Sequence, residues 1–197
     1  MSGRAVVETL TGKAAETAIA DLARLRIAVF RDFPYLYDGD LDYERKYLRK
    51  FAQLPESTLV VARDGAAIVG ASTALPMAKA EEEVMAPFRA QGRDPAQHYY
   101  FGESVLLPAY RGQGVGVAFF ARREERARAL GFRYATFCAV DRPIDHPRRP
   151  RDYVPLDAFW THRGYVKHPE LVATFTWKEV DAAEETPKTM TFWVKTL

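Results

Sequence analysis

Hydrophobic side chains recur every three to four positions in several stretches of the chain, the spacing that gathers them on one face of a helix. Between 17 and 31 the recurring residues are Ile19, Leu22, Ala23, Val29 and Phe30. The same spacing returns from Val117 to Leu130, with Gly131 as a C-terminal stop. These and weaker patterns predict helices over 17–31, 41–53, 81–91, 117–130 and 156–163.

Short runs of β-branched and apolar residues predict strands over 6–10, 58–63, 66–74, 98–107, 134–140, 172–180 and 189–195. Asp64-Gly65 joins two of them as a hairpin turn, because glycine accepts a positive φ at no steric cost. Residues 142–155 hold four prolines and predict a long irregular connection. Tight turns join some strands and helices separate others. We therefore expect an α/β fold with a mixed sheet flanked by helices, formed as one domain over 1–197.

Composition narrows the class of protein only moderately. The 197 residues are 48% hydrophobic and 27% charged, which is ordinary for a globular chain. The net charge of +2 argues against a partner bound by phosphate neutralisation, so we expect no nucleic acid. The single cysteine, Cys138, excludes an intrachain disulfide. With no apolar run of signal-peptide or membrane-spanning length, we expect a cytoplasmic protein without a membrane partner.

The most informative stretch is Val105-Leu106-Leu107-Pro108-Ala109-Tyr110-Arg111-Gly112-Gln113-Gly114-Val115-Gly116. An expected strand runs into a loop with three glycines, and the loop opens an expected helix. Amides at a helix start have no internal partners, and the helix dipole adds partial positive charge there. Glycine has no Cβ, so an anion can approach the backbone closely. The stretch therefore predicts a phosphate-binding loop.

Neither common nucleotide-binding pattern fits this loop. A P-loop ends in Gly-Lys-Ser/Thr, and no lysine stands in that place; the dinucleotide pattern needs a glycine at 117, which is Val117. A glycine turn without a ligand is the other alternative. It is disfavoured because three alternating glycines cost conformational entropy that a plain turn need not spend.

Arg111-x-x-Gly114-x-Gly116 resembles the Q/R-x-x-G-x-G/A signature of the GCN5-related N-acetyltransferases. The preceding Val105-Leu106-Leu107-Pro108, the Asp64-Gly65 hairpin and Phe159-Trp160-Thr161-His162-Arg163-Gly164-Tyr165 are also similar to elements of that family. The resemblance implies a mostly antiparallel sheet. It also implies transfer of an acetyl group from acetyl-CoA to a primary amine, which attacks directly in a ternary complex.

The resemblance assigns roles around acetyl-CoA, and it implies no metal. The loop amides of Arg111, Gly112, Gln113, Gly114, Val115 and Gly116 would hold the pyrophosphate. Backbone groups of Val105, Leu106 and Leu107 would contact the pantetheine and the acetyl carbonyl. Arg122 and Arg123, one to two turns into the following helix, are expected near the 3′-phosphate. In the family a bulge commonly separates this strand from the next, here 134–140, and makes a slot for the thioester.

Glu103 is the candidate general base, because a carboxylate in an apolar and aromatic strand is desolvated and becomes a better proton acceptor. A structural ion pair is the alternative. Family members often place a tyrosine acid four residues before the closing glycine, where this chain has Trp160. Tyr153 and Tyr165 are the substitute candidates for the acid, and packing with a capped hydroxyl is the alternative for each. Cys138 is expected to be an inert buried thiol.

Residues 33–40 correspond to the connection that commonly frames the acceptor in this family. Tyr35, Tyr37 and Asp38 suit a cationic or aromatic amine through cation–π contact and carboxylate pairing, and Trp160 is a further candidate contact. The expected partner is a small-molecule or peptide amine, and the last two strands could pair across a homodimer. A catalytically silent acyl-CoA-binding or regulatory domain is the alternative function.

Overall fold

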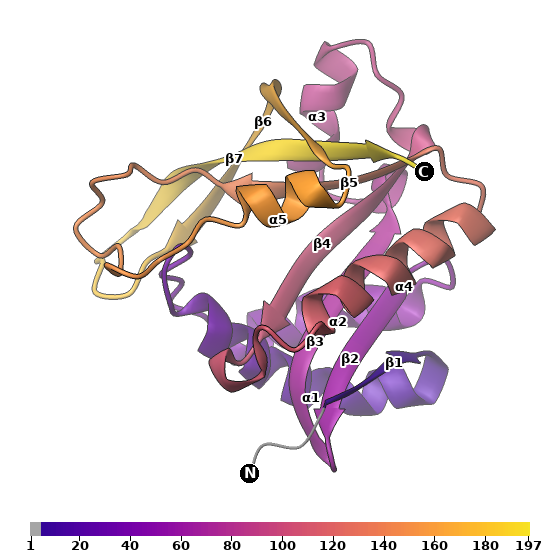
Figure 1. Ribbon diagram of the computed structural model, residues 1–197, viewed down its shortest axis with the longest axis horizontal. Helices are drawn as coiled ribbons and strands as arrows, with labels where there is room; N and C mark the ends of the chain where they lie inside the picture. Colours follow the sequence, from indigo (N-terminus) through magenta and orange to yellow (C-terminus); the bar gives the residue numbers. More distant parts are fainter. Residues whose placement is uncertain (1–4) are drawn as a thin grey trace.

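The computed structural model describes residues 5–197, and its elements follow the predicted order (Figure 1). The strands are β1 (Val6–Leu10), β2 (Thr58–Asp64), β3 (Ala67–Pro76), β4 (His98–Leu106), β5 (Tyr134–Val140), β6 (Val166–Lys178) and β7 (Glu185–Thr196). The α-helices are α1 (Gly12–Phe30), α2 (Leu41–Gln53), α3 (Glu82–Ala90), α4 (Val115–Ala129) and α5 (Asp157–His162). Short 3-10 turns, η1 (Met77–Lys79), η2 (Pro95–Gln97) and η3 (Pro108–Tyr110), complete the order.

The strands form one seven-stranded sheet in the order β1-β2-β3-β4-β5-β7-β6. Only β4 and β5 run parallel; the other neighbouring pairs are antiparallel. The predicted mixed, mostly antiparallel sheet flanked by helices is therefore confirmed.

Helices cover both faces of the sheet (Figure 1). On one, the α1 face, Leu22 and Leu48 pack with β2, β3 and β4, while Phe88 of α3 packs with Phe192 of β7. On the other, the α4 face, Phe120 and Phe119 lie in two further clusters of buried side chains. Burying apolar stripes on both faces is what stabilises this layered arrangement.

Strands β4 and β5 separate shortly after they meet. Their parallel ladder joins only His98–Tyr100 to Tyr134–Thr136. On the other side of β4, Thr73 is opposite Glu103 and Ala74 is opposite Phe101, so Gly102 is the extra residue of a β-bulge. A Cβ at Gly102 would lie 2.8 Å from Thr73 Oγ1, which explains the glycine there. The bulge bends β4 away from β5, as the family resemblance predicted.

Three boundaries differ clearly from the prediction. Strand β7 begins at Glu185 rather than 189, because its polar first residues pair with the end of β6. Helix α1 begins at Gly12 rather than 17, because its first turns pack through the small residues Ala15 and Ala18, which a search for large apolar side chains overlooks. Strand β6 begins at Val166 rather than 172. The residues before Val172 are mostly polar and include Pro169; an edge strand tolerates them, and a bulge interrupts its pairing there.

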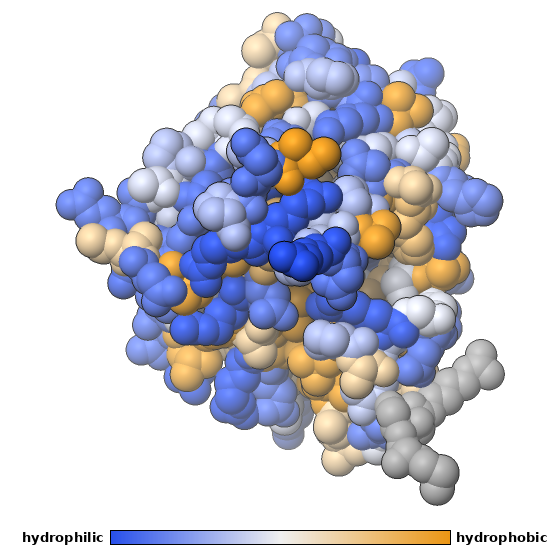
Figure 2. Space-filling view, turned by 60° about the vertical axis from the view of Figure 1, so that its left-hand side comes forward, coloured by the Kyte–Doolittle hydropathy of each residue, from blue (hydrophilic) through white to orange (hydrophobic). Residues whose placement is uncertain are grey.

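No helix within residues 5–197 is long and apolar enough to cross a bilayer. Figure 2 brings forward the end of the molecule that carries the connection between β5 and α5. That surface is mainly hydrophilic, with apolar side chains in small separate patches.

Candidate active site

The glycine loop opens α4 as predicted. Gly112 and Gly114 have φ values of 75° and 83°, the left-handed region in which side chains are strained, and a Cβ on either would meet nothing within 4 Å. In the described chain, the amides of Gly112, Gln113, Gly114, Val115 and Gly116 donate to no protein acceptor. The Arg111 amide differs, because it donates to the Pro108 carbonyl at 3.1 Å. The loop therefore presents five donors at a helix start. The Arg111 amide is not one of them, although it was among the amides predicted to hold the pyrophosphate.

Arg123 supports the bulge from the α4 face. Its guanidinium donates to the carbonyls of Thr73 (3.3 Å) and Glu103 (3.2 Å) and to Ser104 Oγ (2.9 Å). Burial lowers the pKa of Arg123 to about 10. A side chain so enclosed does not reach a phosphate in solvent, so the expectation for Arg123 is wrong. Arg122 is exposed and lies 3.6 Å from Glu125.

The bulge turns Glu103 onto the α1 face. One carboxylate oxygen lies 2.6 Å from Arg26 Nη1, and the other accepts from the Tyr47 hydroxyl at 2.9 Å. Arg26 also pairs with Glu44, and all three charged side chains are more than nine-tenths buried. Burial acts to lower the pKa of Arg26, but Glu103, Tyr47 and Glu44 hold it above its ordinary value. Glu103 thus belongs to a structural ion pair, and its role as base stays a prediction.

The two tyrosine candidates lie in different surroundings. Tyr165 is enclosed on the α4 face, where its hydroxyl donates to Glu124 at 3.1 Å, and burial raises its pKa. This is the packed and capped alternative, so Tyr165 does not enter the proposed site. Tyr153 lies in the β5–α5 connection with its ring 4.7 Å from that of Phe33. Trp160 packs 5.1 Å from Phe137 on the α4 face.

The predicted acceptor segment points in three directions. Asp38 faces outward and pairs with Lys178 (3.3 Å) and Arg31 (3.6 Å). Tyr37 is directed at Glu44: burial raises its pKa, and the charge of Glu44 and a hydrogen bond to it add to the rise. Only Tyr35 packs against both clusters of the α1 face. Asp38 thus pairs with cations of the chain itself, and its contact with the acceptor stays a prediction.

Cys138 is buried on β5, with its sulfur 3.4 Å from the Tyr100 hydroxyl. Burial raises the pKa of its thiol to about 12, so it remains a thiol at neutral pH. The structure agrees with the expectation of an inert cysteine.

Sequence reasoning missed the polar residues that brace the α1 face, above all Arg26 and Arg142. Arg26 left a signal: it stands four residues after Leu22 and four before Phe30, on the buried stripe of α1. No sequence pattern points to Arg142, because its partners, the carbonyls of Pro34 and Tyr35, are far away in sequence.

A sheet opened between two parallel strands, with a donor-rich glycine loop beside the opening, defines an acyl-CoA-dependent transferase fold. A profile of the acetyltransferase (GNAT) family matches residues 22–150. The chain belongs to this family. No curated protein sequence gives a significant match.

Solved structures of the same fold are distant in sequence. A ribosomal-protein-alanine N-acetyltransferase from Brucella melitensis is 14% identical, with a TM-score of 0.62 over 98% of this chain and 99% of that one. A proposed acetyltransferase from Salmonella typhimurium, solved with acetyl-CoA, is 14% identical, with a TM-score of 0.60 over 99% and 95%. An aminoglycoside 6′-N-acetyltransferase with coenzyme A is 14% identical, with a TM-score of 0.61 over 97% and 96%.

No group of three or more His, Cys, Asp or Glu side chains in residues 5–197 is arranged to hold a metal ion.

Proposed function

We propose that this chain is an N-acetyltransferase, a single transferase domain that moves the acetyl group of acetyl-CoA to a small amine. The observation that carries the proposal is the loop from Gly112 to Gly116, whose five amides have no acceptor in the described protein. It lies beside the opening between β4 and β5. Solved relatives of this fold contain acetyl-CoA or coenzyme A.

The residues present fit the CoA group. The amides of Gly112, Gln113, Gly114, Val115 and Gly116 would hold its pyrophosphate, and backbone groups of Val105, Leu106 and Leu107 would contact the pantetheine and the acetyl carbonyl. Phe159 of α5 packs beside Gly116, where an added Cβ would lie 3.6 Å from the Phe159 ring, an ordinary van der Waals contact. When bound, acetyl-CoA supplies an activated thioester.

Transfer requires a neutral amine, so the chain must accept a proton from the incoming ammonium. We assign this step to Glu103, directly or through one water. Arg26 and Tyr47 fix its carboxylate. The amine nitrogen bonds to the acetyl carbon, the carbon–sulfur bond breaks, and the sulfur leaves as a thiolate that takes a proton. Tyr153 is the candidate donor to the sulfur, since the hydroxyl of Tyr165 is bound to Glu124.

Calorimetry and a thiol-release assay test this function. We expect CoA to bind and acetyl-CoA to release free thiol when a suitable amine is added. Binding of ATP or NAD in place of CoA would contradict the proposal. CoA binding without thiol release for any amine or peptide would support the silent-domain alternative.

A substitution tests the base. Glu103→Gln is expected to lower kcat by about 10²–10⁴-fold with little change in the CoA dissociation constant, because general acid–base catalysis contributes about that much. Glu81→Gln is a matched control, since Glu81 is a partly exposed carboxylate paired only with Lys50. An unchanged kcat for Glu103→Gln across the pH range would remove Glu103 from the mechanism.

A further inference from the structure

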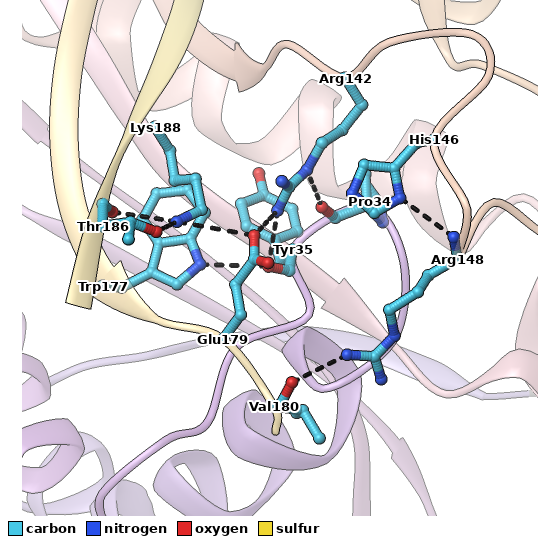
Figure 3. Close-up of polar contacts among 10 residues, drawn as sticks. All are labelled: Pro34, Tyr35, Arg142, His146, Arg148, Trp177, Glu179, Val180, Thr186 and Lys188. Atoms are coloured by element: carbon cyan, nitrogen blue, oxygen red, sulfur yellow. Dashed lines mark hydrogen bonds and ion pairs between the residues drawn. The ribbon is translucent and has the colours of Figure 1, made fainter. Parts of the chain in front are cut away.

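A second buried group of charges lies where the β5–α5 connection meets the β6–β7 hairpin (Figure 3). Arg142 Nη2 lies 2.7 Å from Glu179, and Lys188 Nζ lies 3.6 Å from the same carboxylate. The side chains of Arg142 and Lys188 are only 9% and 8% exposed. Two enclosed cations share one carboxylate here, so the group carries a net positive charge.

The guanidinium of Arg142 has one nitrogen, Nη1, that is available to a ligand. Its Nε donates to the Pro34 carbonyl at 2.6 Å and its Nη2 to the Tyr35 carbonyl at 3.0 Å. Its Nη1 makes no hydrogen bond with residues 5–197, and it is not among the enclosed polar atoms that lack a partner. Solvent therefore reaches Nη1, and a ligand could too. The guanidinium is anchored on one side and open on the other, as required to bind a carboxylate.

The Glu103 group has the opposite charge. Two carboxylates, Glu103 and Glu44, share the single guanidinium of Arg26, and all three side chains are nearly enclosed. The group is thus net negative and lies on the same face of the sheet. At low dielectric a buried excess charge attracts an opposite ligand charge more strongly than it does in water.

Tyr35 links the two groups. Its carbonyl accepts from Arg142 and from Trp177 Nε1 (3.1 Å), which fixes its backbone beside the positive group. Its ring packs against the clusters under α1 and α3. The Tyr35 ring also lies 4.6 Å from the ring of Phe30, and the Arg26 guanidinium lies 5.1 Å from that same Phe30 ring. Tyr35 therefore touches the positive group through its carbonyl, and its ring approaches the Glu103 group through Phe30 and Arg26.

From this dipolar arrangement we propose that the acceptor amine also carries a carboxylate: the substrate is an amino acid whose amine and carboxylate are separated by a chain of several carbon atoms, with its ammonium at the Glu103 group and its carboxylate at Arg142 Nη1. The inference rests on the proposed acetyl transfer. It adds the substrate class and gives Arg142 the role of a specificity-determining residue. The outward-facing Asp38 plays no part in it.

The first test compares matched acceptors in the thiol-release assay. 6-Aminohexanoate, its amide and hexylamine share one amine and one carbon chain but differ in the carboxylate; 4-aminobutyrate and butylamine form a pair with a shorter spacing. We expect kcat/KM to fall by about 10- to 100-fold when the carboxylate of the better substrate is removed, the loss typical of a charge-assisted hydrogen bond.

The second test uses substitutions. Arg142→Gln should raise KM for the amino acid at least tenfold and leave KM for the matching amine nearly unchanged, while Arg142→Lys should lie between. Arg148→Gln is the matched control, because Arg148 also donates to a backbone carbonyl, that of Val180 (2.9 Å), but is 42% exposed. Thermal melting of each variant verifies that it folds.

The outcomes separate the two proposals. If amines with and without a carboxylate react equally well, or if Arg142→Gln weakens both acceptors to the same extent, the amino-acid inference is wrong while acetyl transfer stands. If no acceptor releases thiol although CoA binds, the proposed function itself fails.

Discussion

Arg122 and Arg123 are neighbours in α4 with opposite environments. Arg122 points to solvent, whereas Arg123 is enclosed and donates to two carbonyls and a hydroxyl at the bulge. A buried arginine is tolerated where its own donors are hydrogen-bonded, and acceptors at the bulge provide these partners. Arg123 thus serves the shape of β4 rather than the binding of an anion.

This difference gives a prediction for stability. Arg123→Met keeps most of the side-chain volume but removes the charged donors to the carbonyls of Thr73 and Glu103. At about 1.5–3 kcal/mol for each hydrogen bond to a charged group, we expect a loss of about 3–6 kcal/mol in the free energy of unfolding, measured by urea titration. Arg122→Met should change it by less than about 0.5 kcal/mol. Similar losses for both variants would contradict this role of Arg123.

At the scale of elements, α4 is flanked by two glycines in the same conformation, one before its start and one after its end. Gly114 has φ 83° and Gly131 has φ 80°, and a Cβ at either meets nothing within 4 Å. The two positions therefore have equal backbone strain on substitution, but only Gly114 lies in the predicted phosphate loop.

Gly114→Ala and Gly131→Ala form a matched pair. Each should lower the free energy of unfolding by about 1–2 kcal/mol, the cost of a left-handed residue with a side chain. Only Gly114→Ala should also weaken CoA binding, by about fivefold or more, because one misaligned amide loses a hydrogen bond of about 1 kcal/mol. Equal CoA dissociation constants for the two variants, measured by calorimetry, would argue against the loop as the phosphate site.

The same scale shows what local patterns determine. The predicted ranges 6–10, 41–53 and 134–140 match β1, α2 and β5 at both ends. Their apolar periodicity is regular, and Asp40 caps the start of α2 by accepting from the Tyr43 amide. The glycine loop was equally predictable, because its chemistry is that of a few consecutive residues.

Contacts between distant segments were not predictable in this way. The pairing of Arg26 with Glu103 and the hydrogen bond from Arg142 to Pro34 depend on how the helices and connections pack on the sheet. Asp38 is a further example, because its ion-pair partner Lys178 lies far away in sequence, at the end of β6.

At the scale of the whole molecule, His98 links stability to pH. It is enclosed at the start of β4, with Nδ1 2.8 Å from Thr136 Oγ1, and burial lowers its pKa to about 4. In the unfolded chain a histidine binds its proton near pH 6.5, whereas in the folded protein it does so only near pH 4. The unfolded state therefore binds more protons between these values, and stability falls as the pH falls through that window.

We expect His98 to account for a loss on the order of 3 kcal/mol in the free energy of unfolding between pH 6.5 and pH 4. Urea titrations at several pH values should show a shallower acid-side decline for His98→Gln than for the unaltered protein. His162→Gln, at an exposed position of α5, is the control and should follow the unaltered curve. Parallel curves for all three proteins would contradict the assignment.

The sheet has its shortest ladder of paired residues between β4 and β5. Five or more residue pairs join every other couple of neighbouring strands, but three join β4 to β5. The least costly deformation of the molecule is therefore a change in the angle between its two half-sheets, with the short ladder from His98 to Tyr100 acting as the hinge. Any molecule that contacts both half-sheets would limit this motion.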